Sequence, residues 1–129
     1  MSRSEGDRRG VTFIELLTVV VIIGLLAIFA LPRLSRNKEK TIIASMQSDM
    51  RNLAIAEEGF YYANATYSTN VVALNITLSQ GNVLTINQAS VSGWSATMAN
   101  PSTPQQCYLF HGTATPVGSA VVEGDINCS

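Results

Sequence analysis

Residues 10–17, with the sequence GVTFIELL, decide the fold of this 129-residue chain. They open an apolar run that extends to Leu31 and contains a single ionisable side chain, Glu15. A run of this length can cross a bilayer as one helix. A lone carboxylate in such a helix costs about 2.5 kcal/mol or more on insertion scales, so we expect Glu15 to have a function.

A short charged segment, residues 1–9, precedes this run. An ordinary secretory signal would be cut after its apolar part, at a small-x-small site. The nearest such position, after Ala30, is a poor site because Ile28 stands three residues from the cut and Pro32 follows closely. Basic residues flank the run on both sides, so charge does not settle its orientation. We therefore favour a run that is retained after processing.

The charged segment ending in Gly10, with Thr12 and residues 14–17 after it, resembles the N-terminus of type IV pilins and their pseudopilin relatives. Gly24 and Pro32 also match positions where many type IV pilins carry a helix-weakening glycine and proline. The resemblance covers about the first third of the chain and is closest to type IVa major pilins. Beyond residue 62 it depends on architecture and a cysteine pair.

The resemblance implies that residues 1–10 are a leader, cut by prepilin peptidase between Gly10 and Val11. The new amine at Val11 would then be N-methylated, although the family usually has phenylalanine at that position. Thr12, Phe13 and Glu15 would take part in assembly. The Glu15 carboxylate would pair with the Val11 amine of a neighbouring copy and set the axial register. The alternative is a polar residue tolerated near the lipid interface.

The pattern after Pro32 is that of an amphipathic helix. Its inward positions step by three or four residues: Ile43, Met46, Met50, Leu53, Glu57 and Phe60. We predict one helix over residues 11–62, with residues 11–34 in the membrane or the filament core. Gly24 weakens a helix, and Pro32 removes a backbone donor, so we expect a break or kink between them.

The remaining residues, 63–129, predict a β-rich head. Short runs rich in β-forming residues, at residues 83–87, 93–98, 106–111 and 120–123, are separated by Gly, Pro, Asn and Ser. We therefore expect an α+β pilin fold, in which the long helix packs on a four-stranded antiparallel sheet. Cys107 and Cys128 are the only cysteines, and in an exported protein an even pair predicts a disulfide, with two buried thiols as the alternative.

Charge is segregated along the chain. All eight basic residues lie between Arg3 and Arg51, and the head beyond Gly59 has only Glu123 and Asp125 as ionised groups. This distribution disfavours nucleic-acid binding by the head. The basic cluster at residues 33–40 would contact lipid phosphates in the precursor or carboxylates of neighbouring copies, for which Asp49, Glu57 and Glu58 are candidates.

No catalytic or metal constellation is found in the sequence. His111 is the only histidine, and a structural role is favoured for it, as for the aromatic group Phe60, Tyr61, Tyr62 and Tyr67. Glu123 and Asp125 alone support a calcium site weakly. Three N-x-S/T matches, at Asn64, Asn75 and Asn127, leave glycosylation open. We expect no cofactor and no enzyme activity.

The resemblance predicts a structural subunit of a type IV pilus that polymerises with itself into a helical surface filament for adhesion, twitching motility or DNA uptake. Its implied partners are prepilin peptidase, an inner-membrane assembly platform and ATPases. Before assembly the precursor would be a single-pass inner-membrane protein with a cytoplasmic N-terminus. The alternative function is that of a pseudopilin in type II secretion.

Overall fold

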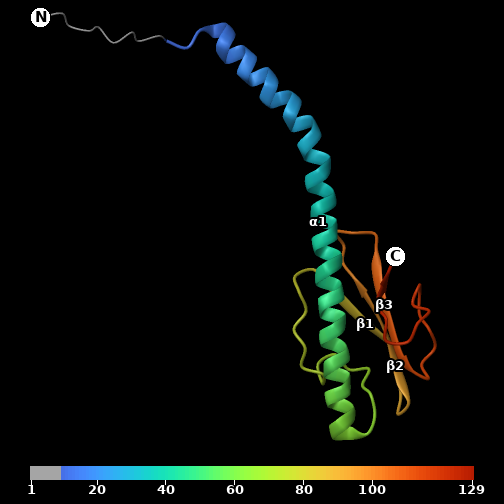
Figure 1. The fold of residues 1–129 in the computed structure, drawn as a ribbon. Coiled ribbons are helices and arrows are strands. Elements are labelled where there is room, and N and C mark those ends of the chain that lie inside the picture. Colours follow the sequence, from blue (N-terminus) through green and yellow to red (C-terminus); the bar gives the residue numbers. More distant parts are fainter. Residues whose placement is uncertain (1–9) are drawn as a thin grey trace, which may run out of the picture. The chain divides into compact units, whose positions relative to one another are not determined.

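A computed structural model of the chain describes residues 10–129, so the predicted leader lies outside the described residues except for Gly10. The elements are α1 (Phe13–Asn64), β1 (Val83–Ala89), β2 (Gly93–Ala99), β3 (Gln106–Gly112) and β4 (Asn127–Cys128) (Figure 1). The predicted α+β fold, one long helix with a four-stranded antiparallel sheet, is confirmed. The helix begins and ends two residues later than the predicted range of 11–62.

Helix α1 is uninterrupted through Gly24 and Pro32, where the sequence predicts a break. Pro32 has no N–H to donate to the carbonyl group of Ile28, but the single missing bond does not end the helix in the isolated chain. A break at these residues therefore stays a prediction for the assembled state, in which neighbouring copies would contact this segment.

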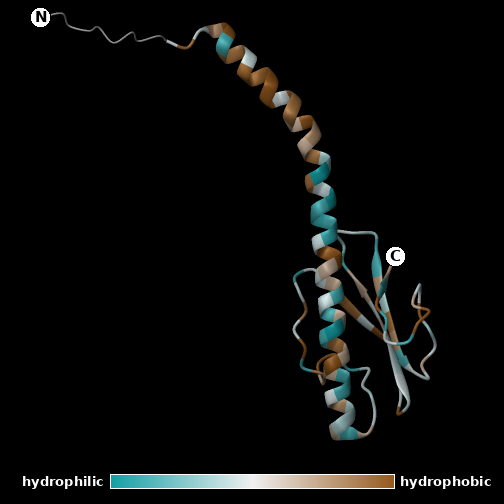
Figure 2. Ribbon diagram, in the orientation of Figure 1, coloured by the Kyte–Doolittle hydropathy of each residue, from teal (hydrophilic) through white to brown (hydrophobic). Residues whose placement is uncertain are grey.

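The chain divides into two compact units, Met1–Arg36 and Asn37–Ser129. In the first unit every described residue is exposed, and the hydrophobic colouring of Figure 2 runs around the whole helix. Within the described residues, α1 is the one helix long and apolar enough to cross a membrane. A helix that is apolar on all sides and uncovered needs lipid or other helices around it.

The second unit contains the sheet, with strand order β1-β2-β3-β4 and antiparallel pairing throughout. The predicted fourth strand at residues 120–123 is wrong, because the strand lies at Asn127–Cys128. The segment before it forms turns instead, closed by bonds from the Ala120 N–H to the Val117 carbonyl and from the Asp125 N–H to the Val122 carbonyl. Ala120 is buried although its segment is not a strand.

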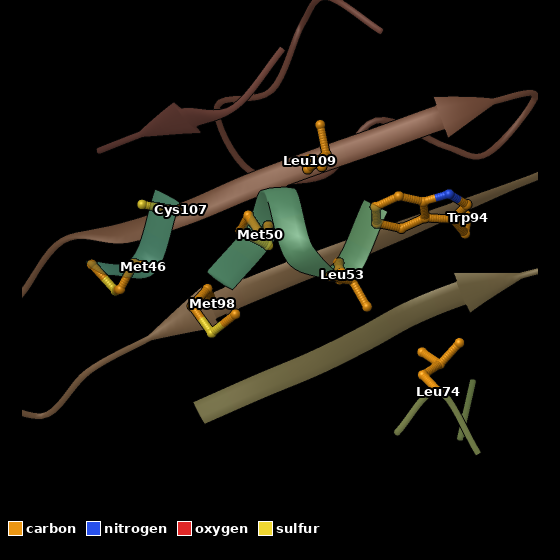
Figure 3. Close-up of a cluster of buried hydrophobic side chains, with 9 residues drawn as sticks. Met46, Met50, Leu53, Leu74, Trp94, Met98, Cys107 and Leu109 are labelled. Atoms are coloured by element: carbon orange, nitrogen blue, oxygen red, sulfur yellow. The ribbon is translucent and has the colours of Figure 1, made fainter. Parts of the chain in front are cut away.

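The core lies between one face of α1 and one face of the sheet (Figure 3). The helix contributes Met46, Met50 and Leu53, which have no exposed surface and follow the predicted spacing. The opposing side chains are Leu74, Trp94, Ala96, Met98, Cys107 and Leu109. Each large side chain buried in this way contributes about 1.5–3 kcal/mol, so this layer holds the sheet on the helix.

Residues 113–126 cover the second face of the sheet at β3, whereas the outward-facing residues of β1 are exposed. Side chains alternate along β3, so Tyr108 and Phe110 face away from the core that contains Cys107 and Leu109. Phe110 is nevertheless buried, and the Gly124 N–H donates to its carbonyl group at 3.0 Å. Gly118 lies against the ring of Tyr108 with a φ of +55°, where a Cβ atom would come within 2.4 Å of the ring. This position requires glycine.

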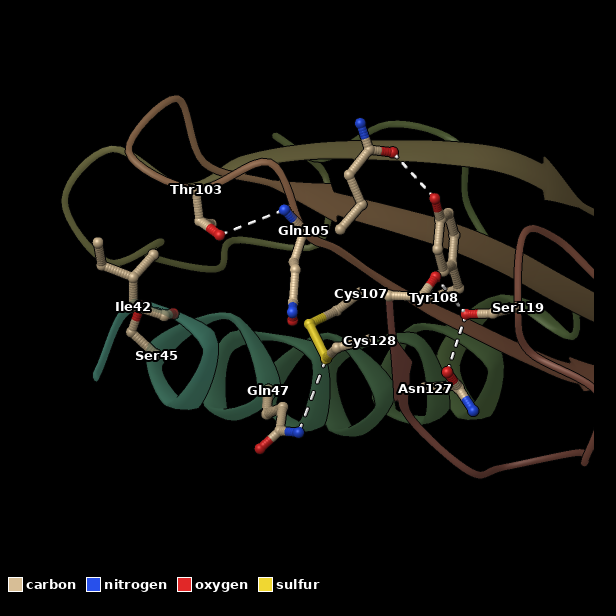
Figure 4. The surroundings of a disulfide bond; sticks show 12 residues. Ile42, Ser45, Gln47, Thr103, Gln105, Cys107, Tyr108, Ser119, Asn127 and Cys128 are labelled. Atoms are coloured by element: carbon tan, nitrogen blue, oxygen red, sulfur yellow. Dashed lines mark hydrogen bonds between the residues drawn. A yellow bond between two sulfur atoms is a disulfide. The ribbon is translucent and has the colours of Figure 1, made fainter. Parts of the chain in front are cut away.

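The disulfide joins Cys107 on β3 to Cys128 on β4, as predicted (Figure 4). Next to it, Gln106 and Ser129 exchange two backbone hydrogen bonds of 3.0 Å each. Gln47 on α1 donates to the Cys128 sulfur at 3.6 Å. Since β4 has only two residues, the covalent bond reinforces its short pairing with β3.

Loss of the disulfide is expected to lower the free energy of unfolding by about 3 kcal/mol. The reason is that the bond closes a loop between two cysteines separated by 21 residues in the sequence. Denaturant titration of the full-length chain in detergent, with and without reductant, measures this loss. The double variant Cys107→Ser/Cys128→Ser serves as the control, because reductant should not affect it. Equal stability of the oxidised and reduced chains would contradict the prediction.

Candidate functional site

The N-terminus of α1 is closed by two reciprocal hydrogen bonds between Thr12 and Glu15. The Glu15 N–H donates to Thr12 Oγ1 at 3.2 Å, and the Thr12 N–H donates to Glu15 Oε2 at 3.1 Å. With Phe13 as the first helical residue, this is a capping box. The spacing T-x-x-E before an apolar run is the sequence signal of such a cap. Glu15 was expected only to contact a neighbouring copy, so its role as a cap is a finding of the structure.

This geometry gives Glu15 a favourable environment within its own chain. Its carboxylate lies in the first turn, at the positive end of the helix dipole, and it accepts one backbone hydrogen bond. Within residues 10–129 no hydrogen bond reaches the second oxygen, Oε1, which therefore remains available to a further donor. The capping box thus holds the carboxylate one turn from the residue predicted to become the amino terminus.

Gly10 and Val11 precede the helix, in an exposed segment without regular secondary structure. A peptidase must accommodate the scissile bond in its active site, which a helical bond would resist because its backbone groups are already paired. The predicted cleavage site therefore lies where the backbone is accessible. Thr12, Phe13 and Glu15 are also exposed, so all the residues predicted for processing and assembly are available to a partner.

Two carboxylates that we expected to face neighbouring copies are instead buried within the head. Asp49 is 3% exposed and Glu57 is fully buried. They lie on the sheet-facing side of α1, where the connector between α1 and β1 supplies hydrogen-bond donors. The expectation that Asp49 and Glu57 contact neighbours is therefore wrong, and of the three predicted acids only Glu58 is exposed.

Asp49 is the centre of a buried polar network. Its carboxylate accepts from the Ser79 N–H at 2.7 Å, from the Ser79 hydroxyl at 2.9 Å and from Asn82 Nδ2 at 2.7 Å. Asn82 in turn accepts from Asn100 Nδ2 at 2.8 Å. The network ties the end of the α1–β1 connector to the helix, and its three donors compensate for the burial of the charge.

Glu57 is less well satisfied. Its Oε2 accepts from the Ser68 N–H at 2.9 Å, whereas its Oε1 is buried with no hydrogen-bond partner among the described residues. Burial raises the pKa of the Glu57 carboxyl above its ordinary value of 4.5; the Ser68 N–H opposes this rise and the nearby Glu58 charge adds to it. Glu57 therefore fixes the start of the connector, but its burial lowers the stability of the folded chain once the carboxyl is ionised.

The substitution Glu57→Gln should change how stability depends on pH. A carboxyl whose pKa is raised in the folded state binds more protons there than in the unfolded chain, so its contribution to stability is fully present below pH 4.5 and is lost as pH rises through the folded pKa. A tenfold difference in proton affinity between the two states corresponds to about 1.4 kcal/mol. The stability of Glu57→Gln relative to the parent chain should therefore increase as pH rises from 4.5 to 7.

Denaturant titrations across this pH range would test the effect, with Asp125→Asn at an exposed position as the matched control. If the difference in unfolding free energy between the parent chain and Glu57→Gln does not vary with pH, the inference that burial raises the pKa of Glu57 is contradicted.

Aromatic side chains join the C-terminal end of α1 to β3. Tyr61 and Tyr67 stack with ring centroids 4.7 Å apart, and the His111 ring meets the edge of Tyr67 at 5.8 Å. The Tyr67 hydroxyl donates to Glu58 Oε1 at 3.1 Å. Burial, reinforced by this bond to a carboxylate, raises the pKa of Tyr67 to about 12. These contacts agree with the structural role predicted for Tyr61 and Tyr67, and Phe60 packs against the core, whereas Tyr62 is 96% exposed and takes no part.

His111 lies between two carboxylates. Its Nε2 is 3.5 Å from Glu58 Oε1, and its Nδ1 is 3.3 Å from Glu123 Oε1. Because the two carboxylates approach opposite nitrogens of the ring, they do not converge on one point. Over residues 10–129, no three His, Cys, Asp or Glu side chains are arranged to hold a metal ion.

Comparison with known proteins agrees with the N-terminal assignment. A family model described as the prokaryotic N-terminal methylation motif matches residues 6–31. The chain is 35% identical over 72 residues to the type II secretion system core protein G of Klebsiella pneumoniae, which covers 56% of this chain and 51% of that protein. It is 32% identical over 77 residues to the core protein G of Klebsiella michiganensis, which covers 60% of this chain and 54% of that protein.

The chain spans about half the length of the curated relatives it matches. These relatives carry a secretion-system name, whereas the resemblance noted in the sequence is closest to type IVa major pilins, and the motif does not distinguish these two branches. The matched segment contains the predicted cleavage site, the capping box and Gly24. Residues 6–31 of the chain carry the prokaryotic N-terminal methylation motif, which is the motif of type IV pilin-like prepilins.

Proposed function

We propose that the protein is a structural subunit of a type IV pilus, cut between Gly10 and Val11, N-methylated on Val11 and polymerised into a helical surface filament. This proposal depends on the first unit of the chain. There the apolar helix is uncovered, and Thr12 and Glu15 cap its N-terminus. Such a helix lies in lipid in the precursor and is covered by the same helix of other copies after assembly. The function is thus structural and not catalytic.

The disulfide agrees with a head that lies outside the cytoplasm, as it would in a surface filament and also in a periplasmic one, because disulfides form and persist in both places. The proposed partners are prepilin peptidase, an inner-membrane assembly platform and its ATPases. Adhesion, twitching motility and DNA uptake are the functions that such a filament would serve.

The second candidate is a pseudopilin of a type II secretion system. It is favoured by the relatives, which are named as core protein G of that system. Processing, methylation and helical polymerisation would be the same in both candidates. They differ in where the filament ends: outside the cell for a pilus, and within the envelope for a pseudopilus.

Intact mass and N-terminal sequencing of the chain from fibres sheared off the cells that make it would distinguish the two. A surface pilin gives sheared fibres containing a chain that starts at methylated Val11 and is two hydrogens lighter for the Cys107–Cys128 bond. A processed chain found only in the envelope fraction favours the pseudopilin. A chain cut after Ala30 contradicts both candidates.

A further inference from the structure

A cleft of about 200 Å³ opens between α1 and the sheet in the second unit. It is lined by Ala54 and Glu58 of α1, Trp94 of β2, Leu109 and His111 of β3, and Gly124. An indole ring and aliphatic groups therefore line an opening that also carries a carboxylate. A cleft with this lining suits a long side chain with an apolar stem and a cationic end.

The charge at the cleft is negative. The Glu58 side chain is 57% exposed, and its Oε1 faces the Tyr67 hydroxyl and His111. In the described part of the chain, no hydrogen bond reaches its other oxygen. Glu123 contacts His111 from the opposite side and also accepts from the Gly112 N–H at 2.7 Å. Two carboxylates therefore accompany one histidine at this position, and no lysine or arginine among residues 10–129 is paired with them.

Exposed basic side chains lie elsewhere on α1. Arg33, Arg36 and Lys40 are spaced by three and four residues, so they lie on one face of the helix, which we call the basic stripe. Lys38 is on the opposite face. All four are exposed, and within residues 10–129 no lysine or arginine forms a salt bridge with a carboxylate.

We propose that the cleft receives a side chain of the basic stripe from a second copy of this chain. The cation would pair with Glu58 and lie close to the indole of Trp94, while its stem contacts Ala54 and Leu109. This inference rests on the proposed function, because it describes a contact between copies in a filament. It replaces the expected contacts of Asp49 and Glu57, which are buried.

The positions of the two surfaces along α1 determine the kind of assembly. Lys40 and Glu58 are separated by 18 residues of one helix, or about 27 Å at 1.5 Å per residue. A copy that offers its basic stripe to one neighbour leaves its cleft open to another. The contact is therefore heterologous, and such contacts produce an open helical filament when their rotation does not close a ring.

A charge-swap experiment on the full chain tests this contact. Arg36→Glu/Lys40→Glu should lower the yield of sheared fibres by at least about tenfold, the change expected from losing about 1.4 kcal/mol per contact. Adding Glu58→Lys should restore most of the yield. Lys38→Glu, compared with the single variant Lys40→Glu, is the matched control, since the two make the same charge change on opposite faces of the helix. Thermal melts of each variant check that the head is folded, because Glu58 also holds Tyr67 and His111.

Cysteine cross-linking gives an independent readout. Lys40→Cys combined with Glu58→Cys, treated with a bifunctional maleimide that replaces the reach of the lysine stem, should give cross-linked multimers on denaturing gels, and Lys38→Cys combined with Glu58→Cys should not. The cross-link is measured in fibres and in membranes, so it reports on the contact even if no fibre leaves the envelope. Cross-links in membranes without surface fibres support the contact and contradict only the surface-pilus assignment.

Two results would overturn the inference while leaving the proposed function intact. In the first, the parent chain forms normal fibres, the cysteine variants give no cross-link, and Glu58→Lys does not restore the yield of Arg36→Glu/Lys40→Glu. The second is a loss of precursor from the membrane in Arg36→Glu/Lys40→Glu, again without a cross-link, which would assign the basic stripe to lipid phosphates.

Discussion

Replacing Asp49 by alanine is expected to destabilise the head by about 3 kcal/mol or more, because three donors that now bind its carboxylate would be left without an acceptor in a site that is almost fully buried. Typical domains are stable by about 5–15 kcal/mol in total, so the variant would be largely unfolded or degraded in cells. Asp49→Asn keeps the shape and one acceptor oxygen, but places an amide donor against existing donors, and should be intermediate.

The measurement is urea unfolding of the full chain in detergent, followed by Trp94 fluorescence. Trp94 is the only tryptophan and is 2% exposed, so its emission reports on the core between α1 and the sheet. Ser48→Ala, at an exposed position next to Asp49, is the matched control and should change stability by less than about 0.5 kcal/mol. An Asp49→Ala chain as stable as this control would show that the network does not hold the connector.

Substituting Glu15 should nearly abolish filament formation while leaving the precursor in the membrane. The capping box makes it possible to separate two roles of this residue. Glutamine still offers an acceptor to the Thr12 N–H, so Glu15→Gln keeps the cap and removes only the charge. Glu15→Ala removes both. If the carboxylate neutralises the Val11 amine of a neighbour, both variants should be incorporated poorly, with yields lower by about a hundredfold for a loss of about 2.8 kcal/mol.

Thr12 variants supply the control. Thr12→Ser keeps the hydroxyl that accepts from the Glu15 N–H, whereas Thr12→Ala removes it at a cost of about 1 kcal/mol to the helix end. The yield of sheared fibres is compared with the amount of processed chain in membranes. Normal filaments from Glu15→Gln would contradict charge pairing and leave capping as the function of Glu15.

Periodicity in the sequence predicted the helix and three of the four strands. In these elements the spacing of apolar residues along the chain is enough to show which side chains face the core and which face solvent. It failed at β4, whose two residues carry no alternation and are held in the sheet by the disulfide and by the bonds between Gln106 and Ser129. Residues 120–123 have a strand-like composition, but the turns before and after them prevent pairing.

The candidate site was predicted in part. Glu15 was singled out because an acid in an apolar run is conspicuous, and the motif match includes the leader junction, but cleavage there and the pairing of Glu15 between copies stay predictions. The burial of Asp49 and Glu57 was missed because it depends on donors from Ser79, Asn82 and Ser68, which are distant in the sequence. Spacing places a carboxylate on the inward face of a helix, but only the path of the connector shows whether donors meet it there.

The two buried carboxylates also determine which part of the head can vary. Glu57 binds the backbone N–H of Ser68 and Asp49 binds that of Ser79, so each end of the connector is fixed through main-chain atoms, which any residue except proline supplies. Between these two points only Leu74 is buried. Ile76 and Leu78 also pack against the core from partly buried positions, so the freedom to vary is confined to the exposed side of the loop. Residues 71–73 can therefore accept substitutions and short insertions without disturbing the core. The same subunit architecture can thus present many different surfaces, and this loop is the place in the head to insert a foreign peptide for display.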